Sequence, residues 1–347
     1  MFTRWIYIAL MIAVFVPLAT VGVHADNEND VICGDLAESD CQILKDNFTA
    51  MESVGAFSFS ISMTMDMPEG DGADERTAIN MSLDAQGSLS VDPAILAVIV
   101  DLEDQIEQSP SMLLSQDTIT VVDSFIAGLT GDVTLDLYMV AEGETTDVAM
   151  HLLMRDGIFV LDAGALADLM GEPMQGLDWL GLDANGIMTL LASDPSMTEA
   201  LGLMDDMTTD SSDLKAIEEA ATSVTRLADS EINGVAVAVF ESSVDLGVLT
   251  DVVMELYDSQ GSMDPAEIAL ARETLAETEL TMWQYIGLSD HYTYRTAVSM
   301  EMGDSDVDMA MSLSMTLDQS NFNEPVVVEI PEDAFVMPLA MLMQMGN

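Results

Sequence analysis

Residues 57–67 read FSFSISMTMDM, and this stretch decides the fold. Every odd position, from Phe57 to Met67, carries an apolar side chain, and every even position carries serine, threonine or aspartate. A repeat of two is typical of a β-strand with one apolar and one polar face, because successive side chains point to opposite sides of the strand. The stretch therefore predicts a strand that lies with one face against a core.

Further stretches repeat this alternation. In residues 79–90 the apolar side chains again fall on one side, and the acidic, glycine-bearing residues 68–74 predict a hairpin turn between the two stretches. The Asp156-Gly157 pair predicts another hairpin turn. The other predicted strands cover residues 133–139, 148–154, 158–161, 223–230, 235–244, 279–287, 292–302, 307–317 and 326–330.

Helical spacing of apolar residues separates the groups of strands. Asp92-Pro93 predicts the start of a helix, because aspartate caps the first turn and proline fits its first position. Strands and helices are grouped rather than strictly alternating, which predicts an α+β fold with an antiparallel sheet whose apolar face is covered by helices. The predicted helices cover residues 37–48, 94–106, 120–129, several segments between 164 and 220, 246–257 and 265–275.

The N-terminus has the pattern of a secretory signal. Arg4 precedes an apolar run from Trp5 to about Val23, and Val23-His24-Ala25 fits a cleavage site. An uncleaved membrane anchor is the alternative, since the run is about long enough to span a bilayer. Pro17 interrupts the run, however, and polar residues follow it at once. We therefore expect residues 1–25 to be a signal peptide, removed from a secreted or periplasmic cell-envelope protein without a stable membrane anchor.

The charge of the chain is extreme. It has 62 acidic residues against 8 lysines and arginines, a formal net charge of −54. Such a surface repels nucleic acid and anionic membranes, which argues against both as partners. Two explanations remain, divalent-cation binding and a surface solvated in high salt, and the scattering of the acids along polar faces favours the second. With 49% hydrophobic residues the chain can form a large core, and we expect residues 51–347 to be a single domain behind an N-terminal segment, residues 26–50.

Two cysteines lie in that N-terminal segment. In an oxidising compartment the spacing of Cys33 and Cys41 allows a disulfide that closes a small loop. No histidine or further cysteine lies near them in the sequence, which argues against a metal site. The residues before Cys33 also lack the small side chain of a lipidation site. We therefore expect a Cys33–Cys41 disulfide and no metal.

The order of several short motifs resembles a known group of proteins. DGIFVLD stands at residues 156–162, EINGVAVAVF at 231–240, LTMWQYIG at 280–287 and LDQSNFNEPVVVEIPEDA at 317–334. In this order they are similar to the LolA/LolB-like lipoprotein-carrier fold, and within it to the LppX/LprG-type lipid-binding lipoproteins, over most of residues 50–335. The resemblance implies a curved antiparallel β-sheet (half-barrel) with helices covering the concave face. It also implies binding of a lipid or acyl chain without catalysis.

The predicted apolar sheet face is unusually rich in methionine, a flexible and polarizable side chain. Three explanations stay open: a deformable cavity for lipid tails, Cu(I) binding by thioethers, and ordinary core filling. If the first holds, the cavity is expected to be lined by Phe57, Phe59, Ile61, Met63, Met65, Met81, Leu83, Leu135, Leu137, Met139, Met150, Leu152, Met309, Met311, Leu313 and Met315.

The sequence thus predicts an extracytoplasmic binding protein that holds or carries an apolar ligand, a lipid or an acyl chain, between sheet and helices. The alternatives are an acidic structural or interaction protein of the cell envelope with a solid core, and a copper- or calcium-binding envelope protein. No Gly-x-Ser-x-Gly motif is present, and neither His151 nor His291 sits in a recognisable motif. We therefore expect neither an enzyme nor a cofactor.

Overall fold

A computed structural model describes residues 31–67, 79–108, 112, 115–141, 144–164, 177–186, 221–245, 278–302 and 311–338 of the chain. The predicted signal peptide, residues 1–25, lies outside these ranges. The helices predicted between residues 164 and 220 lie almost entirely outside them, as do those over 246–257 and 265–275.

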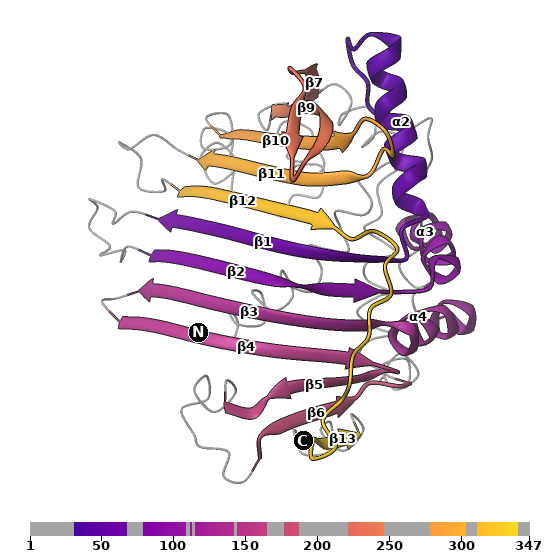
Figure 1. Cartoon of the computed structure of the whole chain (residues 1–347), viewed down its shortest axis with the longest axis vertical. Helices are drawn as coiled ribbons and strands as arrows, with labels where there is room; N and C mark the ends of the chain where they lie inside the picture. The colour runs from indigo at the N-terminus through magenta and orange to yellow at the C-terminus, as the bar shows by residue number, and fades with distance from the viewer. Residues whose placement is uncertain are drawn as a thin grey trace, which may run out of the picture.

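One large antiparallel sheet dominates the described residues (Figure 1). Its strands are β1 (Ala56–Met67), β2 (Ile79–Ser90), β3 (Thr130–Ala141), β4 (Glu144–Arg155), β5 (Ile158–Asp162), β6 (Trp179–Asp183), β7 (Thr222–Arg226), β8 (Ser230–Ile232), β9 (Val235–Asp245), β10 (Glu279–Gly287), β11 (Thr293–Met302), β12 (Met311–Ser320) and β13 (Phe335–Pro338).

The strands follow the order β13-β6-β5-β4-β3-β2-β1-β12-β11-β10-β9-β7, and β8 pairs with β9 beside this path. Every pair is antiparallel except β13 with β6. Strand β1 lies in the middle, between β2 and β12, so strands from the N-terminal and C-terminal parts of the chain meet at the centre of the sheet. The sheet does not close, and the predicted α+β class with an open half-barrel is confirmed.

Three helices accompany the sheet within the described residues: α2 (Glu38–Glu52), α3 (Pro93–Gln108) and α4 (Gln116–Gly128). They lie along one end of the strands (Figure 1). The backbone N–H of Ala94 donates to the Asp92 carboxylate at 2.9 Å, so the predicted start of α3 is confirmed. Helix α4 begins earlier than the predicted residue 120, because the Ser115 hydroxyl caps it by accepting from the Thr118 N–H at 3.2 Å.

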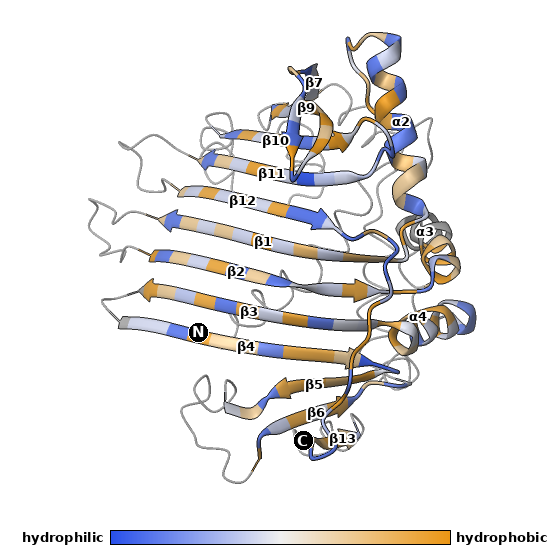
Figure 2. Ribbon diagram, in the orientation of Figure 1, coloured by the Kyte–Doolittle hydropathy of each residue, from blue (hydrophilic) through white to orange (hydrophobic). Residues whose placement is uncertain are grey.

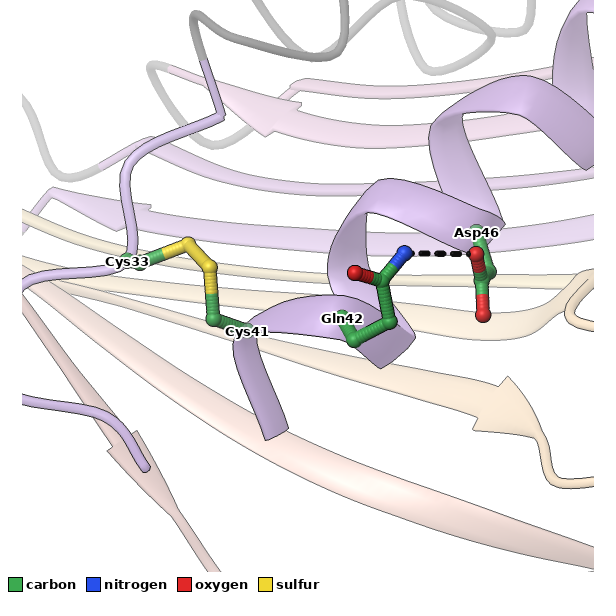
Figure 3. The surroundings of a disulfide bond; sticks show 4 residues. All are labelled: Cys33, Cys41, Gln42 and Asp46. Carbon is green, nitrogen blue, oxygen red and sulfur yellow. Dashed lines mark hydrogen bonds between the residues drawn. A yellow bond between two sulfur atoms is a disulfide. The ribbon is translucent and has the colours of Figure 1, made fainter. Parts of the chain in front are cut away.

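Helix α2 packs on the sheet through its inner side. Leu44 is buried with Ala238, Phe240 and Ile286 of β9 and β10. Before the helix, Cys33 and Cys41 form a disulfide with their Cα atoms 5.3 Å apart (Figure 3). The bridge ties the incoming chain to the first turn of α2, and this small loop adds Val31 and Leu36 to the same apolar cluster.

The apolar face of the sheet is the side that carries the odd-numbered residues of β1. In the strand register Met63 lies opposite Leu83 on one side and Met315 on the other, and Leu83 lies opposite Leu137. Figure 2 shows the resulting bands of apolar and polar residues along the strands. The main core lies on this face, with Ile61 at 2% exposed, Leu83 at 1% and Leu317 at 0%.

The outer face of the sheet is the side that carries the even-numbered residues of β1. It is polar over β1 and β2, but near β4 and β5 it buries Leu153 and Val160. They are covered by the strap, residues 321–334, which crosses the sheet from β12 to β13 (Figure 1). A strand predicted over 326–330 is therefore wrong. Its alternate side chains, Val326, Val328 and Ile330, pack against the sheet instead of pairing with it.

Prolines explain why the strap is not a strand. Pro325 and Pro331 bracket the apolar residues, and proline has no N–H to offer a ladder. The Val328 carbonyl instead accepts a hydrogen bond from Arg155 Nη1 at 2.9 Å. Because one side of the strap packs against Leu153 and Val160, every second side chain of residues 326–330 is buried or half-buried, as in a half-buried strand.

Two neighbouring substitutions test the assignment of faces. Leu83→Ala is expected to lower the free energy of unfolding by about 3 kcal/mol, because Leu83 is 1% exposed and its loss leaves a cavity. Asp84→Ala, on the exposed outer face, is expected to change it by less than about 0.5 kcal/mol. Urea unfolding measures both, and equal effects would contradict the assignment.

Candidate functional site

The apolar face is organised in rows that run across the strands. One row crosses β3, β2, β1, β12 and β11, and each member lies opposite the next: Met139, Met81, Met65, Leu313 and Met300. The next row toward the helices consists of Leu137, Leu83, Met63, Met315 and Val298. Directly opposed side chains on one face are close enough to contact each other. The rows therefore form one continuous apolar surface.

Burial changes along the strands. Of the residues predicted to line a cavity, those of β1 to β3 nearer the helices are buried: Phe57, Phe59, Ile61, Met63, Leu83, Leu135 and Leu137. The others are half-buried: Met65, Met81, Met139, Met150, Leu152, Met311, Leu313 and Met315. Met309 lies outside the described residues. The face thus has a closed end near the helices and a half-buried methionine row, Met139, Met81, Met65, Leu313 and Met300, toward the other end.

Several members of this face were missed by sequence reasoning. Leu280 and Met282 of β10 and Val298 and Met300 of β11 extend the two rows, and all four are half-buried. The alternation in residues 296–302 could have identified the β11 pair, since Thr296, Val298, Met300 and Met302 occupy every second position.

Buried polar side chains interrupt the apolar face at Thr296, which lies opposite Leu317, and at Gln319. Gln319 lies opposite Phe59 and is 2% exposed. Within the described part of the chain, neither its Nε2 nor its Oε1 atom has a hydrogen-bond partner. A buried amide without partners destabilises a fold by about 1–3 kcal/mol. By contrast, the buried Asn47 of α2 donates to the His291 carbonyl at 2.6 Å and to Thr293 Oγ1 at 3.0 Å.

These two buried amides lead to opposite expectations. Gln319→Leu removes an amide without partners, so it is expected to raise the free energy of unfolding by up to about 1–3 kcal/mol. Asn47→Leu leaves the His291 carbonyl and the Thr293 hydroxyl without the amide that donates to them. This substitution is therefore expected to lower the free energy of unfolding by about 1–3 kcal/mol. Denaturant unfolding of the two variants checks the pair. A clear loss of stability in Gln319→Leu would mean that this amide has a structural partner.

The arginines within the described residues are engaged with acids. Arg295 donates to both carboxylate oxygens of Asp318, at 2.5 and 2.8 Å. These hydrogen bonds are the largest cause that raises the pKa of Arg295. Arg226 contacts Asp229 and lies 3.7 Å from Asp40 of α2, and Arg155 lies 3.2 Å from Asp156. These side chains pair with the protein's own acids, which argues against their holding an anionic head group.

Tyr294 lies at the β9 to β11 end of the sheet. Its burial, followed by the hydrogen bond that its hydroxyl donates to Asp290 at 2.7 Å, raises its pKa to about 12. A tyrosine in an unfolded chain titrates near pH 10. The ionised form is thus disfavoured in the folded state, and the contribution of this group to stability is full below pH 10 and is lost as the pH rises through 12.

Unfolding experiments between about pH 10 and pH 12 should therefore show stability falling with pH. Tyr294→Phe cannot ionise, so its stability is expected to fall less steeply over the same range. A variant that follows the wild-type pH dependence would contradict the assignment of this titration to Tyr294.

The described residues contain neither a cluster of metal ligands nor a helix that could span a membrane. No three His, Cys, Asp or Glu side chains come together there as metal ligands. None of the helices described is long and apolar enough to cross a bilayer. A groove of about 620 Å³ opens on the outer face, under the strap, and not on the apolar face.

Comparisons with known proteins give structural similarities only. No family model and no curated protein matches the chain. LprF from Mycobacterium bovis is 13% identical with a TM-score of 0.34, over 86% of this chain and 99% of that chain. The Mycobacterium tuberculosis lipoprotein LppX is 10% identical with a TM-score of 0.29, over 83% and 97%.

A putative outer membrane lipoprotein-sorting protein domain from Vibrio parahaemolyticus is 10% identical with a TM-score of 0.14, over 82% and 93%. The resemblance stated from the sequence motifs is thus met again among solved structures. At these identities and TM-scores nothing about a ligand follows, and the fold rests on the strand pairing itself.

Proposed function

We propose that this is an extracytoplasmic protein that binds an acyl chain or a similar apolar ligand on its apolar face. The observation that carries the proposal is the row formed by Met139, Met81, Met65, Leu313 and Met300. All five side chains are half-buried, and they lie in register across five strands.

The chemistry of this row suits a flexible hydrocarbon. Methionine has an unbranched, polarizable side chain that adapts to ligands of irregular shape. Burial of each CH₂ group of a ligand contributes about 0.8 kcal/mol, so a long chain lying along such a row can bind without any polar contact. The closed end of the face, in contrast, is explained by core filling, since its residues pack in the main core. The proposal therefore concerns the methionine row and not the whole face.

Charge narrows the class of ligand. The chain carries a formal net charge of −54, and the described arginines are paired with acids. A protein with this potential repels anions, so a ligand with a neutral head group is favoured over a fatty acid anion or an anionic phospholipid.

The location outside the cytoplasm is supported by two features. The N-terminal sequence has the pattern of a secretory signal. Cys33 and Cys41 form a disulfide, a bond that persists in oxidising compartments and is rare in the cytosol.

Ligand binding is tested with a matched pair of double variants. Met65 lies opposite Met81 on the apolar face, and their sequence neighbours Thr64 and Ser82 lie opposite each other on the outer face. Met65→Gln with Met81→Gln is expected to weaken binding of the neutral dye Nile red by about tenfold, because it places amides in the row. Thr64→Gln with Ser82→Gln should leave binding unchanged. Fluorescence titration measures both, and 1-hexadecanol should displace the dye better than palmitate.

Native mass spectrometry before and after organic extraction gives a second readout. The protein purified from its own host is expected to release a neutral lipid. A protein that carries no lipid and takes up neither Nile red nor 1-hexadecanol would overturn the proposal and favour the structural alternative with a solid core.

Cu(I) binding by thioethers is a second candidate, favoured by one observation. Met65, Met81 and Met139 lie side by side on three neighbouring strands, and soft thioethers select Cu(I). Competition against bathocuproine disulfonate under reducing conditions separates the candidates. Tight Cu(I) binding that the Met65→Gln, Met81→Gln variant abolishes would replace the acyl-chain proposal. Its absence, with Nile red still bound, would support the acyl chain.

A further inference from the structure

The groove of about 620 Å³ lies on the side of the sheet opposite the methionine row. Its floor includes the outer-face residues Ser58, Gln86, Ser88, Asp132 and Thr134 of β1, β2 and β3, together with Phe57, Phe59 and Gly87. Its roof is the first part of the strap, from Asn321 to Val327. The volume lies in the usual range of small-molecule sites. Nothing in the proposed apolar-ligand function uses this groove.

The floor is built from two polar rows. In the first, Ser58 lies opposite Ser88, and Ser88 lies opposite Asp132. In the second, Gln86 lies opposite Thr134. Neighbouring strands are about 4.8 Å apart, so the rows repeat hydroxyl, amide and carboxylate groups at that interval across the sheet. This interval is comparable to the spacing of successive rings in an extended oligosaccharide chain.

The floor is fixed by its own hydrogen bonds. The hydroxyls of Ser58 and Ser88 lie 2.8 Å apart, and Asn321 Nδ2 donates to Ser58 Oγ at 3.2 Å. The Asp132 carboxylate is held by His151 Nε2 at 2.7 Å. Hydroxyl oxygens have two lone pairs and one proton, and a carboxylate accepts several bonds, so these groups keep capacity for a ligand. A ligand that both donates and accepts hydrogen bonds matches this floor.

The roof is anchored at both ends. The Gly55 N–H donates to Asn323 Oδ1 at 2.8 Å at one end, and Arg155 Nη1 donates to the Val328 carbonyl at 2.9 Å at the other. Between the anchors, Pro325, Val326 and Val327 line the groove, and Val327 is 81% exposed. Pro325 and the exposed Val327 thus add apolar surface to the lining of a groove with a hydrogen-bonding floor, a combination that suits the C–H and O–H groups of a sugar ring.

The charge of the groove argues against anionic ligands. The groove's lining includes Asp132 and Glu324 and no lysine or arginine, so phosphate, sulfate and carboxylate ligands are repelled. A cation is not favoured either, because the described residues hold no group of three potential metal-ligating acids, cysteines or histidines. We infer that the groove under the strap binds a neutral oligosaccharide chain, held by hydroxyl and amide contacts to the floor rows of β1 to β3.

Isothermal titration calorimetry with maltohexaose, cellohexaose and chitohexaose tests the inference on the full mature chain. At least one of these neutral probes is expected to bind, and an anionic heparin hexasaccharide is expected not to bind. Ser88→Leu and Gln86→Leu place bulk and apolar surface on the floor, so each is expected to weaken binding by about tenfold or more.

Ser62→Leu is the matched control. Ser62 lies on the same outer face, opposite Asp84 and Thr316, and does not line the groove. Its affinity for the neutral probe should equal that of the wild type, and circular dichroism confirms that each variant is folded. If only the soluble hexasaccharides bind, the ligand of the groove is a free oligosaccharide. If the protein also co-sediments with insoluble cellulose or chitin, the ligand is a polysaccharide. Both outcomes support the site. Binding of none of the probes, tighter binding of heparin, or equal losses in Ser62→Leu and Ser88→Leu would overturn it.

Discussion

The register of β1 between its two neighbours is the constraint on which the rest of the structure depends. Each odd-numbered residue from Phe59 to Met65 lies opposite an apolar-face position of both β2 and β12. A shift of one residue would turn every methionine and leucine of β1 to the opposite face. Because β12 comes from the C-terminal part of the chain, this pairing also closes the domain. The closed core, the methionine row and the polar outer face all follow from this one register.

The two faces of the sheet separate the apolar side chains of this acidic chain from most of its polar and charged ones. The apolar face buries hydrocarbon and thioether groups away from water, with Thr296 and Gln319 among its buried polar side chains. The outer face keeps serines, threonines and acids in contact with solvent. It is apolar where the strap covers Leu153 and Val160, and again at β8 and β9, where Ile232, Val237 and Val239 are buried. A formal net charge of −54 is compatible with folding because the acids can remain solvated while the core forms independently.

Alternation along single strands was enough to predict the sheet and its apolar face, and the Asp92-Pro93 pair was enough to predict the start of α3. It failed where long-range contacts decide the structure. The side chains of residues 326–330 alternate between buried or half-buried and exposed, as in a strand. They do not pair with the sheet, however, and the inward side chains pack on Leu153 and Val160. Strand β6 was missed because only its pairing with β5 and β13 makes five residues extended there. The groove could not be predicted, since its floor and roof bring together residues as distant as Ser58, Asp132 and Val327. The absence of partners for Gln319 is likewise a property of its surroundings.

Photo-crosslinking tests most directly whether the methionine row is a ligand-binding surface. The mature protein would be irradiated with a diazirine-bearing analogue of 1-hexadecanol, and the labelled peptides mapped by mass spectrometry. Labels are predicted on Met65, Met81, Met139, Leu313 or Met300, which lie in one row of the apolar face. Labels confined to outer-face residues such as Ser62, Thr64 or Ser82, or no labelling above a denatured control, would contradict the account.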